Sequence, residues 1–344
     1  MSTRTSSIAG FLLTSGLGLA ALVLLPFWLD SFSLMQATLF AAIGIFALSQ
    51  GFLWGYAGIL SFGQASFFGL GAYTYAVAAI NLGDSTGAIV LAVLIPAGFA
   101  ALLGYFMFFG RISDAYVGVI TLTVSVILYE LLNSTSGSQY RIGSAQLGGF
   151  NGIPALPPFN VPGEPEEWLT ESGMWRVAMG ALLLVYVTMR ALLATRFGRI
   201  LVAIRENETR AMLVGYDVRV HKVLAFAFGG AVAGLGGCIY ACWGGFISPT
   251  VFALTMSAQA IVSVLLGGIG TLVGPILGAV VIQSLVNVSG TQNVVDPNLG
   301  LGIVLVTFVV LVPQGLLPAA AAILSWLIMR VRRTRSTSAS EVQS

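Results

Sequence analysis

The sequence has 344 residues, of which 57% are hydrophobic and only 8% are charged, with a formal net charge of +2. A soluble globular domain carries about 25% charged residues, so this chain has too few to cover a water-exposed surface. The composition excludes an ordinary soluble enzyme and predicts an all-α polytopic membrane protein.

The first apolar run follows Arg4 and extends over residues 8–29. It is too long for the apolar region of a signal peptide, and no clear small-residue cleavage site follows it. We therefore expect it to be a retained span. Residues 1–33 form this N-terminal unit, and residues 34–318 are predicted to form the main transmembrane domain.

A helix needs about 20 apolar residues to cross a bilayer core. This criterion predicts about ten spans, of which the third, eighth and ninth are short or interrupted by glycine, which favours bent or partly re-entrant segments. The predicted spans are residues 8–29, 34–54, 58–80, 87–110, 115–134, 174–194, 223–246, 254–269, 273–290 and 299–318.

The segment WGYAGILSFGQASFFGLGAYTYA (Trp54–Ala76) contains five glycines with polar residues between them. Broken helices at membrane depth are tolerated where protein or a water-filled cavity satisfies the exposed backbone groups. One interpretation is a discontinuous helix that lines a translocation path, with Ser61, Gly63 and Gln64 as candidate pathway residues. The other is a seam of small residues that packs helices together.

Glu130 lies near the outer end of the predicted fifth span. A carboxylate at the bilayer centre costs about 2.5–3.5 kcal/mol on insertion scales, and less near the interface. Glu130 is therefore either a pathway or helix-holding residue, or an interfacial residue that reaches water. The long Gly- and Pro-rich loop that follows, residues 135–173, is interpreted as a docking platform for an external partner or as a cover over a pore mouth.

The distribution of Lys and Arg predicts the orientation. Residues 190–222 hold seven Lys or Arg, and the tail, residues 319–344, contains four Arg at residues 330–335, followed by a Ser-rich end. Both regions are predicted to be cytoplasmic, and ten spans then place the N-terminus there as well. Arg141 and Arg176 fall on the outer side as exceptions.

The cytoplasmic loop, residues 195–222, gathers much of the charge of the chain around apolar positions. Glu206 and Arg210 are spaced as one continuous helix would pair them, and Gly215 is expected to end that helix. Such an amphipathic, mixed-charge helix favours a docking element for a soluble partner. The alternative is an ordinary positively charged inner loop.

Glycines four residues apart predict close helix packing. Gly230 and Gly234 have this spacing, as do Gly270, Gly274 and Gly278. The second set is predicted to form one ridge, with a proline that loosens its backbone.

No phosphate-binding loop, metal-binding motif or catalytic set is present in the sequence. Cys238 and Cys242 are expected to be packing residues, and His221, the single histidine, to lie at the surface. We expect no enzyme activity and no metal on this chain. A transporter is favoured over a membrane scaffold; a secondary transporter or channel that acts without ATPases stays open, although few carboxylates are available for ion coupling.

Five stretches in order resemble the LivM-type permease subunits of ABC importers for branched-chain amino acids, and the similar permeases for urea and short amides. The resemblance covers residues 34–318. The stretches are GYAGILSFGQASFFGLGAY (Gly55–Tyr73), RFGRILVAIRENETRAMLVGYDV (Arg196–Val218), KVLAFAFGGAVAGLGGCIYA (Lys222–Ala241), GFISP (Gly245–Pro249) and LLGGIGTLVGPILGA (Leu265–Ala279).

The resemblance implies a bacterial-type plasma membrane protein that pairs with a second homologous permease as a heterodimer. Two separate ATPase subunits would bind ATP and Mg²⁺, an extracytoplasmic solute-binding protein would deliver the solute, and this chain would bind no cofactor and no nucleic acid. The coupling region of the family maps onto Glu206, Asn207, Glu208, Arg210, Ala211 and Gly215.

The sequence departs from the family at one place. Many amino-acid members resemble TLGFGE in the fifth span, whereas this chain has TLTVSV (Thr121–Val126). A branched-chain amino acid is the first expectation for the solute, with urea, an amide or a small carboxylate as alternatives.

Overall fold

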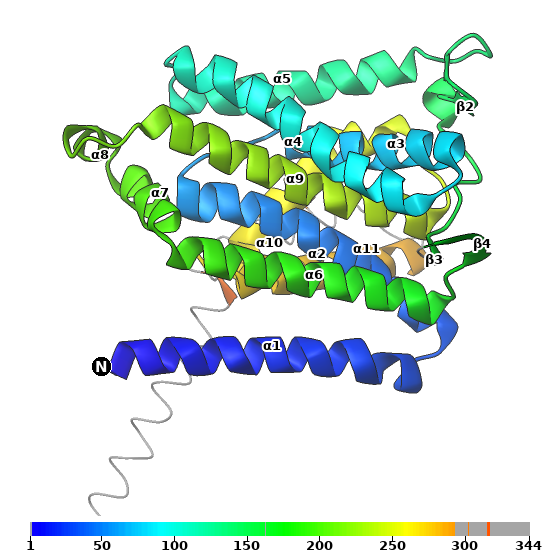
Figure 1. Ribbon diagram of the computed structural model, residues 1–344, viewed down its shortest axis with the longest axis horizontal. Coiled ribbons are helices and arrows are strands. Elements are labelled where there is room, and N and C mark those ends of the chain that lie inside the picture. The colour runs from blue at the N-terminus through cyan, green and yellow to red at the C-terminus, as the bar shows by residue number, and fades with distance from the viewer. Residues whose placement is uncertain (1, 162, 293–301, 303–314, 317–344) are drawn as a thin grey trace, which may run out of the picture.

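The computed structural model describes residues 2–161, 163–292, 302, 315 and 316 (Figure 1). Its helices are α1 (Ser2–Trp28), α2 (Ser31–Ala57), α3 (Gln64–Leu82), α4 (Ser85–Phe109), α5 (Asp114–Asn133), α6 (Glu171–Ala194), α7 (Arg196–Glu206), α8 (Glu208–Leu213), α9 (Val218–Gly244), α10 (Leu254–Gly267) and α11 (Val273–Gln292). Two short hairpins lie between α5 and α6, formed by β1 (Arg141–Ile142) with β2 (Ala145–Gln146) and by β3 (Asn160–Val161) with β4 (Glu164–Trp168).

Seven of the described helices contain an apolar stretch long enough to cross a membrane, and α10 and α11 are shorter apolar helices. The prediction of an all-α polytopic membrane protein is confirmed. Nine of the predicted spans overlap described helices. The tenth, residues 299–318, and the tail, residues 319–344, lie outside the described residues apart from residues 302, 315 and 316.

The helices form a bundle with α2, α3 and α9 at its centre, and α4 packs on α3 and α9 with its other face exposed. Large aromatic side chains fill this centre, and Phe46, Phe67 and Phe226 are fully buried. Helix α1 lies at one edge, where it packs on α6 (Figure 1). Helices α7 and α8 lie at one end of the bundle and the two hairpins lie at the other, so the long loop and the charged loop are at opposite ends.

Glycines allow the central helices to approach closely. A Cβ atom added at Gly234 would lie 2.5 Å from the Ala92 carbonyl oxygen, so α9 contacts α4 through backbone. Gly274 and Gly278 have the same role on α11, where added Cβ atoms would meet the backbone of α10. Gly270 is not part of this ridge, because it precedes α11 and has a φ of +81°, so the predicted ridge holds two glycines rather than three.

The predicted third span is interrupted before its helix begins. Helix α2 ends at Ala57, Gly58 adopts a left-handed conformation with a φ of +73°, and α3 does not start until Gln64. The Ser257 hydroxyl accepts a hydrogen bond from the Ala65 backbone N–H at 3.0 Å. Protein groups therefore satisfy backbone atoms at this break, as a discontinuous helix in a membrane requires.

The long loop before α6 is anchored to the helix ends. The Asn160 side chain accepts a hydrogen bond from the Ser85 backbone N–H at 2.7 Å and donates one to Asp84 at 3.1 Å. Ile153 pairs with Ile247 as an isolated β-bridge, which ties the loop to the segment after α9. These contacts hold the loop over one end of the bundle.

Candidate functional site

Helix α7 is short and strongly amphipathic. Its buried face contains Gly198, Leu201 and Ile204, and its remaining positions carry most of its charge. The helix ends because Asn207 adopts an extended conformation, with a φ of −161°. The sequence prediction of one continuous helix through Glu206 and Arg210 is therefore wrong: Glu206 ends α7 and Arg210 lies in α8.

Helix α8 is a separate turn with its own cap. The Asn207 side chain accepts a hydrogen bond from the Arg210 backbone N–H at 2.9 Å, as an N-cap residue does. Helix α8 ends at Leu213, and Gly215, with a φ of +96°, turns the chain toward α9. The expected helix end at this glycine is confirmed. Asp217 then caps α9 through the Arg219 backbone N–H at 3.1 Å.

A small apolar cluster holds α7, α8 and α9 together. Ile204, Ala211 and Val218 are buried against one another, one from each helix, and Ile200 packs on them. Ala211, a predicted coupling residue, is thus a packing residue whose small side chain lets α8 lie close to its neighbours. Helices α7 and α8 and the start of α9 form one unit, which we call the corner (residues 196–222).

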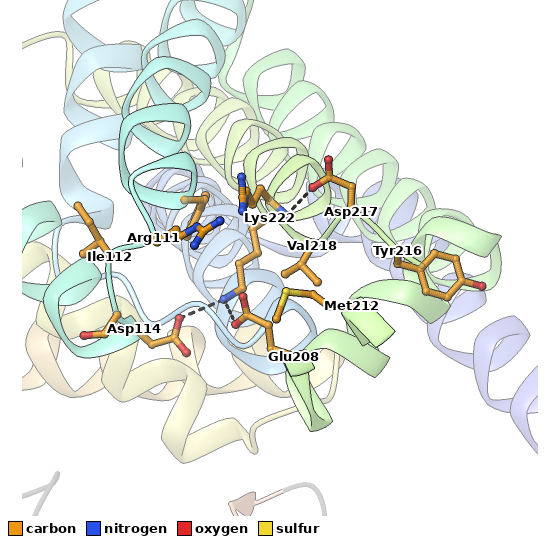
Figure 2. A pocket seen from close by; sticks show the side chains of 12 residues that line it. Arg111, Ile112, Asp114, Glu208, Met212, Tyr216, Asp217, Val218 and Lys222 are labelled. Atoms are coloured by element: carbon orange, nitrogen blue, oxygen red, sulfur yellow. Dashed lines mark hydrogen bonds and ion pairs between the residues drawn. The ribbon is translucent and has the colours of Figure 1, made fainter. Parts of the chain in front are cut away.

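A buried lysine links the corner to α5. Lys222 lies in the first turns of α9, and its side chain is 8% exposed. Its Nζ atom lies 2.6 Å from a carboxylate oxygen of Glu208 in α8 and 3.2 Å from one of Asp114 at the start of α5 (Figure 2). A buried ammonium group needs such partners. The three residues join three helices through one side chain.

A cavity of about 750 Å³ opens beside this ion cluster, between the α4–α5 turn, α8 and the start of α9 (Figure 2). Its wall mixes charged and apolar side chains. The lining residues are Phe108, Arg111, Ile112, Ser113, Asp114, Glu208, Met212, Tyr216, Asp217, Val218, Arg219 and Lys222.

The outer rim of the corner is apolar and exposed. Leu213 is 82% exposed and Val214 is 74% exposed, and Met212 and Tyr216 beside them are exposed as well. Arg210 and Glu206 flank this rim and are also exposed. A contiguous exposed apolar patch with a polar border is typical of a protein interaction site.

The corner also contacts the break between α2 and α3. Arg205 donates a hydrogen bond to the Gly55 carbonyl oxygen, and its stem packs on Gly58. The same guanidinium forms an ion pair with Glu206. Arg205 therefore connects the end of α7 to the place where the second span ends and the chain turns back.

The other predicted site residues lie elsewhere. Ser61 and Gln64 are buried near the α2–α3 break, and Gln64 donates a hydrogen bond to Ser49 at 3.0 Å. Gly63 contacts the backbone of Thr121 in α5. Glu130 is exposed on α5, away from these three residues. The structure thus brings Ser61, Gly63 and Gln64 to one region and leaves Glu130 on an uncovered helix face.

Sequence reasoning did not identify Lys222, Asp114 or Arg205 as site residues. A lysine at the start of a long apolar run, with a separate acid at the start of an earlier span, was a signal for a buried ion pair. The choice of partner depended on which helices are neighbours, which one sequence does not show.

The bundle of apolar helices defines the chain as a polytopic membrane protein, and comparison with known proteins assigns its family. A family model described as "Branched-chain amino acid transport system / permease component" matches residues 33–313. The chain belongs to this family of transport permeases.

Individual relatives agree with the family assignment. The high-affinity branched-chain amino acid transport system permease protein LivM of Salmonella typhimurium is 30% identical over 321 residues, which cover 85% of this chain and 72% of the relative. LivM of Escherichia coli is 30% identical over 344 residues, covering 91% and 77%. The probable LivM of Methanocaldococcus jannaschii is 29% identical over 269 residues, covering 68% and 74%. No solved structure matches the chain significantly.

Proposed function

We propose that this chain is the permease subunit of an ABC importer in the inner membrane that moves a branched-chain amino acid into the cell. The observation that carries the proposal is the corner, an exposed apolar rim beside an ion cluster in which the buried Lys222 joins α8, α9 and α5. Separate ATPase subunits dock on this rim, and the end of the bundle that holds it is cytoplasmic.

The contacts of the corner allow motion of a docked ATPase to reach the membrane spans. Helix α8 is joined to α9 by the chain and by packing, and to α5 through Lys222, while Arg205 of the preceding helix α7 bonds to the end of α2. Displacement of α8 therefore shifts the inner ends of three spans together. Such a shift alternates the pathway between outward-open and inward-open states.

A second homologous permease completes the pathway. Helix α5 lies at an edge of the bundle (Figure 1), and its uncovered face presents Tyr116, Thr123 and Glu130. A carboxylate on a lipid-facing helix is costly unless it reaches water or another protein. We place the partner permease, a homologue rather than an identical copy, against this face, so that Glu130 borders the solute route.

The solute is assigned from the relatives. Two of them are named as high-affinity permeases for branched-chain amino acids. A solute-binding protein delivers the amino acid at the end where the anchored loop, residues 135–170, covers the bundle. ATP and Mg²⁺ bind to the ATPase subunits. A urea or amide permease is the alternative within the family.

Reconstitution of the complete transporter tests the proposal. The chain, its partner permease, the ATPases and the binding protein are placed in vesicles, and leucine uptake is measured with and without ATP. We expect ATP-dependent uptake. The double variant Leu213→Ser with Val214→Ser removes apolar rim surface, so it should release the ATPases and abolish uptake. The double variant Leu213→Ile with Val214→Leu, which keeps these exposed positions apolar, is the matched control.

Two results would contradict the proposal. Retention of the ATPases and full uptake in the rim variant would show that docking occurs elsewhere. Uptake by this chain alone, driven by an ion gradient without ATPases, would support a secondary transporter.

A further inference from the structure

A second cavity lies at the end of the bundle opposite the corner. It measures about 280 Å³ and is bounded by α2, α9, α10 and α11. Gln36 lies near the start of α2 and Trp243 near the end of α9, and both helix ends lie on the side of the two hairpins (Figure 1). The cavity therefore shares no residue with the proposed docking site.

Four carboxamide side chains line this cavity. They come from three helices and belong to Gln36, Gln259, Gln283 and Asn287. The Asn287 amide donates a hydrogen bond to the Gln36 side-chain oxygen at 2.9 Å, which aligns these two groups across α2 and α11. Placing four carboxamide side chains around one space in a membrane-spanning bundle is costly unless their donors and acceptors form hydrogen bonds.

Several of these polar groups have no partner among the described residues. The carboxamides of Gln259 and Gln283 and the hydroxyl of Tyr240 line the cavity and make no hydrogen bond to another described residue. Gln283 is only 9% exposed. Because these polar groups line the cavity, water or a ligand with matching donors and acceptors can bond to them there.

The chemistry of the wall selects the kind of ligand. No Asp, Glu, Lys, Arg or His is among the described residues that line the cavity, so a charged solute would find no opposite charge on this part of the wall. Carboxamides offer both donors and acceptors. The Trp243 indole N–H already donates to the Met35 carbonyl oxygen at 2.8 Å, so its ring contributes apolar surface.

The same face of α2 carries another unpartnered carboxamide deeper in the bundle. Gln36, Ile43 and Gln50 are seven residues apart and so lie on one side of the helix, and the first two line the cavity. Gln50 is fully buried, and neither atom of its amide has a hydrogen-bond partner in the described part of the chain. The polar character of the cavity therefore continues inward along α2.

We propose that this cavity binds a small uncharged solute that carries both hydrogen-bond donors and acceptors, such as a primary amide. Ligand sites usually measure about 300–1,000 Å³, so this one admits only a small molecule. A zwitterionic amino acid is disfavoured because both of its charges would be unpaired. The site shares no residue with the corner, and a primary amide as its ligand agrees with the amide alternative to the proposed solute.

Titration of the purified, complete transporter with acetamide tests this site, with tryptophan fluorescence as the readout. We expect a saturable change that Trp243→Phe removes, because Trp243 lines the cavity. Gln283→Leu should weaken apparent binding by about tenfold, as expected for loss of a buried hydrogen bond or two. Ser284→Ala is the matched control, since the Ser284 hydroxyl bonds within its own helix to Val280.

Three results would overturn the proposal. The first is no saturable response, which would mean that water alone occupies the cavity. The second is an equal response to leucine, which would show that the cavity accepts a zwitterionic solute. The third is an unchanged response in Gln283→Leu and also in Gln259→Leu, a second variant on a different helix. The rim variant of the corner should titrate normally, which separates this test from that of the proposed function.

Discussion

The ammonium group of Lys222 lies 2.6 Å from the carboxylate of Glu208, which ties the start of α9 to the start of α8. The same ammonium group reaches Asp114 at 3.2 Å, so α5 joins the pair. Lys222 is buried whereas both acids are partly exposed. The cluster is therefore anchored in the bundle by the lysine and reaches toward the surface through its acids.

Removal of the lysine charge should uncouple the transporter. Lys222→Met keeps the apolar stem and deletes the ammonium group, so α8 and α5 are no longer joined. Hydrogen bonds to charged groups contribute about 1.5–3 kcal/mol, so we expect about a tenfold or larger loss of uptake per ATP hydrolysed. The measurement is the ratio of leucine uptake to ATP hydrolysis in vesicles. Lys222→Arg, which keeps the charge, should retain part of the coupling, and a normal ratio in Lys222→Met would contradict the role of the cluster.

The two acids of the corner should differ in effect. Reversal of both Glu206 and Glu208 to Lys is expected to uncouple hydrolysis from uptake without loss of membrane insertion. Glu208 meets Lys222, whereas Glu206 is 67% exposed and pairs with Arg205. An exposed pair contributes about 0–1 kcal/mol. We therefore expect Glu208→Gln to impair coupled uptake far more than Glu206→Gln, and the opposite order would refute this division of roles.

Close packing of α9 on α4 predicts a stability effect. Gly234→Leu places a side chain where the Ala92 carbonyl and Pro96 already lie, and overpacking costs about 1–3 kcal/mol or more. The thermal unfolding midpoint of the detergent-solubilised chain should fall. Gly244→Ala is the control, because an added Cβ there meets no atom within 4 Å. Equal midpoints for both variants would show that this interface is not tight.

The anchor of the outer loop should depend on pH. Hydrogen bonds from the Thr86 backbone N–H and from the Asn160 side chain lower the pKa of Asp84 below its ordinary value. Because the pKa is lower in the folded state, the stabilisation is present above the ordinary pKa. It is lost as the pH falls through the lowered value.

Limited proteolysis of the loop, residues 135–170, measures this dependence. Cleavage at neutral pH should be slow and should increase at acidic pH as Asp84 is protonated, with an acid-tolerant protease. Asp84→Asn should weaken the pH dependence and raise cleavage at neutral pH, because the capping carboxylate is lost. Identical pH profiles for the variant and the wild-type chain would exclude Asp84 as the pH-sensitive group.

The sequence by itself determined the class of protein and the order of its spans. Apolar runs of about 20 residues and a low charged fraction predict helices in a membrane. The reason is that the backbone N–H and C=O groups of each segment must form their hydrogen bonds within that segment. The segment rich in glycine around Gly63 and the helix end at Gly215 also followed from local chemistry. Each of these features depends on residues that are near one another in the chain.

The tertiary structure decided which distant residues meet. Lys222 and Asp114 are 108 residues apart, and Gln36 and Asn287 are 251 residues apart. Their pairing depends on which helices are neighbours, and hydropathy does not specify that order because lipid provides no hydrophobic drive for one helix contact over another. The break at Asn207, which separates Glu206 from Arg210, combines a local cap by the Asn207 side chain with the packing of Ile204, Ala211 and Val218 from three helices.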